Sequence, residues 1–181
     1  MLEYLKQSNA KPRLGVSACL LGEAVRYDGK DKKNSFIVDV LSQDCDFIAI
    51  CPEAGAGLGI PRPPVHLVGN LHQARAIGRD DHSLDVTRQL ELFAVEQSQR
   101  LAHIAGFIFK SRSPSCGLLD TPVHNPDNLA EIQTGSGIFA RILTMSRPSL
   151  PVCDENMLTD PAFVREFLKR VQQTHALMVE K

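Results

Sequence analysis

Short apolar runs recur along the chain, with longer amphipathic stretches between them. Four of the runs are rich in β-branched and aromatic residues and predict strands at residues 14–18, 47–50, 106–109 and 150–152. Each is short and is followed by glycine, proline or polar residues, as at the end of a buried strand. The pattern therefore favours a sheet of at least four short strands.

Three of the longer stretches repeat apolar residues every three or four positions and predict helices. The first covers residues 35–42, with Asn34 or Ser35 as its N-cap, and the second covers residues 83–103. A last helix is expected to begin at Pro161, because a proline at the first helical position loses no hydrogen bond. Strands that alternate with helices indicate right-handed crossovers and one α/β domain whose parallel sheet is covered on both faces.

Two stretches show neither the short apolar runs of strands nor the three-to-four-residue repeat of helices. Residues 55–64 are rich in glycine and proline, and residues 119–134 contain several prolines and asparagines, so both are expected to be ordered loops over the sheet edge. The domain is expected to span residues 12–155, after an N-terminal extension at 1–11 and before a C-terminal helix at 156–181 that packs on the same domain.

Composition excludes several classes of protein. The 181 residues include 20 Lys+Arg against 21 Asp+Glu, and this balance disfavours the broad basic surface that a stable nucleic-acid complex requires. Residues 1–11 are polar and lack the apolar core of a signal peptide, and no apolar run approaches the roughly 20 residues of a membrane span. We therefore expect a cytoplasmic protein without a membrane partner. The chain has five cysteines, an odd number, and in a reducing compartment they are not expected to form a disulfide framework.

The cysteines fall at informative places. Cys19, Cys51 and Cys116 each follow a predicted strand, and the carboxyl ends of parallel strands meet at one edge of a sheet. Buried cysteine is often only a small apolar side chain, but these three lie in turns with polar neighbours. Cys45 is expected to be an incidental surface or helix-end thiol, and Cys153 is ambiguous.

Three thiolates suit a soft metal centre. A structural zinc site normally has a fourth Cys or His and a close C-x-x-C pair, which this chain lacks. A cubane iron–sulfur cluster is ordinarily held by four thiolates, so three would leave one iron open to a substrate as a Lewis acid. The glycines at residues 55–59 do not form a dinucleotide fingerprint, because Ile60 and the prolines that follow disfavour the required helix.

Three separated segments resemble a known family. VSACLLG with VRYDG (16–22 and 25–29), CPE with GIPRPPVHLVG (51–53 and 59–69) and FKSRSPSCG (109–117) resemble, in this order, the bacterial family catalogued as domain of unknown function 523, of the thiouracil desulfidase type. The resemblance covers roughly residues 11–155. It implies a Rossmann-like three-layer α/β sandwich with a mainly parallel sheet of four or more strands.

The resemblance also implies a cofactor and site residues. It implies a [4Fe–4S] cluster bound by Cys19, Cys51 and Cys116 with one open iron, and it maps the family's catalytic carboxylate and serine onto Glu53 and Ser113. The expected reaction is the non-redox conversion of a thiolated uracil, either 2- or 4-thiouracil or a small thiouridine nucleotide, to uracil and hydrosulfide. Many members have a cysteine where this chain has a valine at position 25, which leaves the three-thiol set intact.

Other polar residues near these motifs have less certain roles. Arg26 and Asp28 are candidates for recognition of uracil carbonyls or an attached phosphate, against the alternative of solvated turn residues or structural ion pairs. Ser111 and Ser115 are rivals of Ser113 and further candidates for substrate binding. The histidines have no metal-ligand spacing and are expected at surface or satisfied core positions: His66, His72, His82, His103, His124 and His175. The alternative function is a non-catalytic iron–sulfur or zinc protein in redox sensing or sulfur handling, which would not need Glu53 and Ser113.

Overall fold

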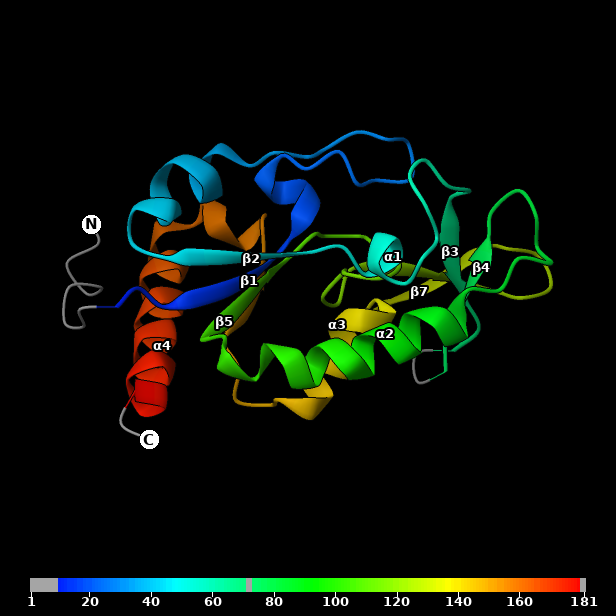
Figure 1. Ribbon diagram of the computed structural model, residues 1–181. Helices are drawn as coiled ribbons and strands as arrows, with labels where there is room; N and C mark the ends of the chain where they lie inside the picture. Colours follow the sequence, from blue (N-terminus) through cyan, green and yellow to red (C-terminus); the bar gives the residue numbers. More distant parts are fainter. Residues whose placement is uncertain (1–9, 71–72, 180–181) are drawn as a thin grey trace.

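The computed structural model describes residues 10–70 and 73–179, in which the strands form two four-stranded sheets (Figure 1). Sheet A has the order β2-β1-β5-β8, and all its pairs are parallel. Its strands are β1 (Arg13–Ser17), β2 (Asp46–Ile50), β5 (Gly106–Phe109) and β8 (Val152–Asp154). The first three lie where the apolar runs predict them, and the fourth begins two residues later than predicted. The prediction of an α/β fold with a mainly parallel sheet is confirmed. The proposed N-terminal extension lies almost wholly outside the described residues.

Sheet A is buried because its two central strands are apolar on both faces. Every residue of β5 is buried, as is typical of parallel strands that are covered on both sides. Leu14, Val16 and Ile108 point into one hydrophobic cluster, whereas Phe107 and Phe109 point into another. The alternation follows from the two-residue period of a strand.

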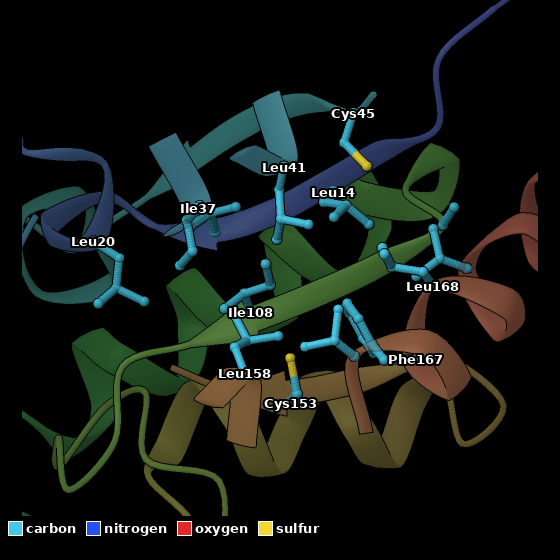
Figure 2. Close-up of a cluster of buried hydrophobic side chains, with 14 of the residues drawn as sticks. Leu14, Leu20, Ile37, Leu41, Cys45, Ile108, Cys153, Leu158, Phe167 and Leu168 are labelled. Atoms are coloured by element: carbon cyan, nitrogen blue, oxygen red, sulfur yellow. The ribbon is translucent and has the colours of Figure 1, made fainter. Parts of the chain in front are cut away.

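Helices cover the two faces of sheet A. On one face lie a π-helical segment, η3 (Phe36–Val40), a following 3-10 turn, η4 (Leu41–Gln43), and the C-terminal helix α4 (Pro161–Val179). Figure 2 shows how Ile37, Leu41, Phe167 and Leu168 meet Leu14 and Ile108 there. The other face packs against α2 (Thr87–Arg100) and α3 (Ile138–Ser146). None of the helices within 10–70 and 73–179 combines the length and the apolar character needed to cross a membrane.

The predicted helices form with adjusted limits. Asn34 caps the first, since its Oδ1 accepts a hydrogen bond from the Ile37 amide, but the segment is π-helical and then 3-10 rather than α-helical. The second begins at Thr87, four residues later than predicted. The Asp85 carboxylate accepts a hydrogen bond from the Thr87 amide and so caps the start of the helix. The last begins at Pro161, with Asp160 accepting from the Ala162 amide.

Sheet B was not predicted. It has the order β4-β3-β6-β7 and consists of β3 (Val65–Val68), β4 (Arg75–Gly78), β6 (Thr121–His124) and β7 (Glu131–Gly135). The expectation of an irregular loop at 119–134 is therefore wrong, because β6 and β7 form an antiparallel pair in this region. Pro122 within β6 hides the strand signal, and pairing with β3 outweighs this local preference.

The remaining elements are short. They are η2 (Ala18–Leu21), α1 (Pro52–Gly55), η5 (Leu101–His103) and η6 (Met157–Thr159). Two of them, η2 and α1, directly follow the neighbouring strands β1 and β2 at the carboxyl edge of sheet A. This edge carries the candidate active site.

Candidate active site

A cavity of about 350 Å³ opens at the carboxyl edge of sheet A. Cys19 in η2, Cys51 just after β2 and Cys116 in the loop after β5 all line it. Three thiols separated widely in the sequence thus face one space, because the strands that carry them are parallel neighbours. Across 10–70 and 73–179, no three His, Cys, Asp or Glu side chains form a group that could hold a single metal ion.

These thiols favour their neutral form in the protein alone. Burial, together with the neighbouring Cys51, raises the pKa of Cys19 to about 11 against the lowering effects of Arg26 and Lys110. Burial also raises the pKa of Cys116 well above its ordinary value, and both Cys51 and Cys19 contribute. The three thiols therefore interact electrostatically, and only added positive charge among them would stabilise three thiolates.

The other two cysteines belong to the core. Cys45 and Cys153 lie in the hydrophobic cluster of Figure 2, and neither lines the cavity. Cys45 was expected at the surface or at the end of a helix. It is buried, with 2% exposed, and it lies shortly after the end of η4. Burial raises the pKa of Cys45 to about 12 and that of Cys153 well above its ordinary value, which makes both poor nucleophiles.

Glu53 is a buried carboxylate in the wall of the cavity. It lies in α1, directly after Pro52, which occupies the first helical position. Its Oε2 accepts a hydrogen bond from Arg62 Nε at 2.8 Å, and its Oε1 accepts one from Ser115 Oγ at 2.9 Å. Each carboxylate oxygen therefore has one donor from the protein, and the side chain is held in a single orientation.

Arg62 is a site residue that the sequence reasoning missed. Its side chain is 4% exposed, and besides Glu53 its Nη1 donates to the carbonyl oxygens of Val25 and Gly59. Its backbone amide also donates to the Tyr27 carbonyl. An arginine between prolines in an otherwise apolar loop was the available signal, because such a residue needs a buried partner.

The structure separates the three candidate serines. Ser115 is fully buried and donates to Glu53, and it does not line the cavity. Ser111 Oγ donates to Glu155 Oε1 at 2.6 Å and accepts from Lys110 Nζ at 2.8 Å. Ser113 lines the cavity, and its Oγ accepts from the Cys116 amide at 3.1 Å. In the described part of the chain, no hydrogen bond occupies the Ser113 hydroxyl proton, so this serine can donate to a molecule in the cavity.

Lys110 and Glu155 form a second, partly buried ion pair. Glu155 follows β8, and its Oε2 also accepts from the Ser111 amide at 2.8 Å. Burial by itself would raise the pKa of Glu155, but hydrogen bonds from Lys110 and Ser111 outweigh it and lower the pKa below its ordinary value. Lys110 also donates to the Ser111 carbonyl and hydroxyl, so its three N–H groups all have partners inside the protein.

The two residues expected to recognise the substrate differ in position. Arg26 lines the cavity, and its guanidinium lies 5.4 Å from the centre of the Tyr27 ring. Asp28 does not line the cavity but faces Arg26, with 3.4 Å between Asp28 Oδ1 and Arg26 Nε. Asp28 therefore contacts the site through Arg26.

A second cavity, of about 460 Å³, adjoins the first on the side of sheet B. Arg79 and Arg112 line both cavities. His66 and His124, whose ring centres are 4.8 Å apart, line only the second. These two histidines are half-buried in a cavity wall, which the sequence did not indicate because sheet B was not predicted.

Arg112 owes its place between the cavities to an unusual backbone. Its φ is 57°, a left-handed conformation that is uncommon outside glycine. The Asp120 carboxylate holds it by accepting from the Arg112 amide at 2.9 Å. Such conformations persist where the surrounding structure enforces them, often at functional sites.

Comparisons with known proteins agree with this site. The sequence model of the 2-thiouracil desulfurase family matches residues 14–155, the range that contains the three thiols and Glu53. Among solved structures, the chain is similar to the [4Fe-4S]-dependent thiouracil desulfidase TudS, with 29% identity and a TM-score of 0.67 over 86% of this chain and 99% of that one. No curated protein sequence gives a match. The chain belongs to the 2-thiouracil desulfurase family.

Proposed function

We propose that the protein is an iron–sulfur-dependent desulfidase, which converts a thiolated uracil to uracil and hydrosulfide without net redox change. The observation that carries the proposal is the single cavity lined by Cys19, Cys51, Cys116 and Glu53 in a chain of the 2-thiouracil desulfurase family. The similar structure, TudS, is described as [4Fe-4S]-dependent.

The residues present fit such a cluster. Thiolates are the ligands of iron–sulfur clusters, and the three cavity thiols are unpaired and come from separate strands. Arg26, Lys110 and Arg62 place positive charge near them, which lowers the cost of three thiolates. The finer proposal is that these three cysteines hold a [4Fe–4S] cluster with one open iron. When bound, the cluster would supply a soft Lewis acid for the thiocarbonyl sulfur.

Glu53 is the proposed general base. Both of its oxygens accept hydrogen bonds, from Arg62 and from Ser115, and this arrangement suits the ionised carboxylate. A carboxylate that faces the cavity can take a proton from a water molecule as it attacks the thiocarbonyl carbon. The same proton is then available for the ring nitrogen or for the departing sulfur, so that the overall reaction is hydrolysis.

Ser113 is the proposed hydroxyl of the site. Its oxygen is fixed by the Cys116 amide, which leaves the O–H to donate toward the cavity. From there it can orient the attacking water or bind the remaining carbonyl oxygen of the pyrimidine. Ser111 and Ser115, in contrast, already donate to Glu155 and Glu53.

The second cavity favours a nucleotide over the free base. A thiouracil ring in the thiol cavity leaves the space beside it for a ribose and its phosphate. Arg79 and Arg112 stand between the two cavities, and guanidinium groups are well suited to bind phosphate. We therefore propose a small thiouridine nucleotide as the preferred form of the substrate.

The experiment is an anaerobic comparison of the native protein with Cys116→Ser and Cys45→Ser. The native protein and Cys45→Ser are expected to bind about four irons and four sulfides per chain and to release hydrosulfide from 4-thiouracil or its nucleotide, whereas Cys116→Ser does neither. Iron without turnover of any thiolated pyrimidine would instead support a non-catalytic iron–sulfur protein.

The substrate form has its own test. With the native enzyme, kcat/KM is expected to be higher for 4-thiouridine monophosphate than for 4-thiouracil. In Arg79→Met this preference should fall at least tenfold, while kcat/KM for the free base changes little. An unchanged ratio would overturn the nucleotide assignment and leave the desulfidase proposal intact.

A further inference from the structure

We propose that Arg62 is a positioning residue. It holds the Glu53 carboxylate in its orientation, and it also holds residues 25–27 against the cavity that contains the three thiols, where they form a wall. The inference rests on the proposed function, since it assigns the support of the carboxylate that would act as the base. Arg62 need not touch the substrate for this role, because it acts through its contacts with other residues.

The contacts of Arg62 divide between two parts of the site. Toward the carboxylate, Nε donates to Glu53 Oε2 at 2.8 Å. Toward the wall, Nη1 donates to the Val25 carbonyl at 2.9 Å, and the Arg62 amide donates to the Tyr27 carbonyl at 3.0 Å. One residue therefore joins α1 to residues 25–27, which lie much earlier in the chain.

Burial makes these contacts obligatory. The side chains of Arg62 and Glu53 are 4% and 12% exposed, so water compensates poorly for the loss of either partner. Removing one member of such a pair leaves a buried charge without compensation, which is far costlier than losing a surface ion pair. Glu53 would then turn away from its present orientation or recruit another cation of the cavity, such as Arg26.

The wall depends on the same residue. Tyr27 and Arg26 line the cavity, and the segment that carries them has little regular structure. Besides the two bonds from Arg62, the Val25 carbonyl accepts a long hydrogen bond from Cys51 Sγ at 3.6 Å. A thiol that becomes a metal ligand can no longer donate, so Arg62 would be the donor that remains at Val25.

The geometry requires arginine rather than any cation. A guanidinium directs its N–H groups in a fixed planar fork, so that Nε and Nη1 reach acceptors on different sides. Arg62 uses this fork for Glu53 and for two backbone carbonyls. The single ammonium of a lysine cannot occupy these positions together.

The test uses Arg62→Lys, which keeps the charge, and Arg62→Ala, which opens a space for added guanidinium. We expect Arg62→Lys to retain its iron and to lose about 10²-fold in kcat, as follows when a reacting group is displaced by about 1 Å. Because the wall also loosens, KM should rise severalfold. Millimolar guanidinium should restore a measurable part of kcat in Arg62→Ala but leave Arg62→Lys unchanged.

A second readout does not depend on activity. Amide hydrogen exchange of residues 23–33 should be at least tenfold faster in Arg62→Lys than in the native protein, with or without iron. The matched control is Arg75→Lys, which alters an Arg–carboxylate pair with Asp85 on an arginine whose side chain is 63% exposed. It should change neither kcat nor the exchange of residues 23–33.

The outcomes separate the two proposals. A native protein that binds iron but desulfurates no thiolated pyrimidine contradicts the proposed function, while the exchange data still test the role of Arg62. Native exchange together with native kcat in Arg62→Lys would overturn the positioning role even if the enzyme is a desulfidase. If Arg62→Ala does not fold, the lysine variant and its control decide.

Discussion

Two carboxylates that are mostly shielded from solvent lie near the thiol cavity, and they have similar partners. Glu53 follows β2 and Glu155 follows β8, the two outer strands of sheet A. Each pairs with one cation and accepts a hydrogen bond from one serine: Arg62 and Ser115 for Glu53, Lys110 and Ser111 for Glu155. Their side chains are nearly equally exposed, at 12% and 13%.

The two carboxylates differ in how many hydrogen-bond donors they have and in whether they face the cavity. Glu155 accepts from Lys110, from the Ser111 hydroxyl and from the Ser111 amide, and it does not line the cavity. Glu53 has one donor on each oxygen and faces the cavity. A carboxylate that has three donors and does not line the cavity is suited to hold the structure together, whereas one that is fixed by two donors and faces the cavity can also exchange a proton with a ligand. Burial and an ion partner therefore do not identify a catalytic carboxylate by themselves.

Glu53→Gln is expected to have the largest effect. An amide of the same shape cannot accept the proton of water, so kcat for hydrosulfide release should fall about 10³-fold. Iron content should stay close to that of the native protein, whereas the free energy of unfolding should fall by about 2 kcal/mol because Arg62 loses its buried carboxylate partner. Turnover at the native rate would show that the open carboxylate is not the base.

Glu155→Gln should destabilise the fold to a similar extent but change catalysis far less. It leaves the Lys110 ammonium without its carboxylate and weakens the bonds from Ser111, so the free energy of unfolding should fall by about 2 kcal/mol. We expect kcat to change less than tenfold. Urea denaturation beside steady-state kinetics checks both values, and a loss of kcat as large as that of Glu53→Gln would remove the distinction between the two carboxylates.

The serines extend the same comparison. Ser113→Ala removes the hydroxyl that points to the cavity and should lower kcat about tenfold with little change in stability. Ser111→Ala removes a donor to Glu155 and should lower the free energy of unfolding by about 1 kcal/mol with little change in kcat. If Ser111→Ala instead lowers kcat and Ser113→Ala instead lowers the free energy of unfolding, the assignment of Ser113 as the functional hydroxyl is wrong.

The smallest effect concerns pH. Because the folded protein lowers the pKa of Glu155 below its unfolded value, the ionised carboxylate stabilises the fold above that unfolded value of 4.5. This contribution is lost as the pH falls through the lower, folded pKa. The difference in unfolding free energy between the native protein and Glu155→Gln should thus shrink between pH 5 and pH 3. A difference that is independent of pH would mean that the charge of Glu155 does not stabilise the fold.

Much of sheet A could be predicted from the sequence, and most of sheet B could not. The strands of sheet A are continuous apolar runs, because both faces of a parallel sheet are covered and periodicity alone reveals them. The strands of sheet B mix apolar with polar residues and are not continuous apolar runs, and β6 contains a proline, so partners far away in the chain decide their structure. Arg79 and the two cavity histidines were missed as site residues for this reason.

Local chemistry determined the candidates, and the fold determined which of them meet. Cys19, Cys51 and Cys116 were identified because they follow apolar runs, and parallel pairing brings their strand ends to one edge. The three serines of the Lys110–Gly117 segment could not be ranked from the sequence, since the choice depends on hydrogen bonds to Glu53 and Glu155 from other strands. Only the tertiary structure shows that Arg62 supports Glu53, because a buried ion pair is a property of two segments packed together and not of either one.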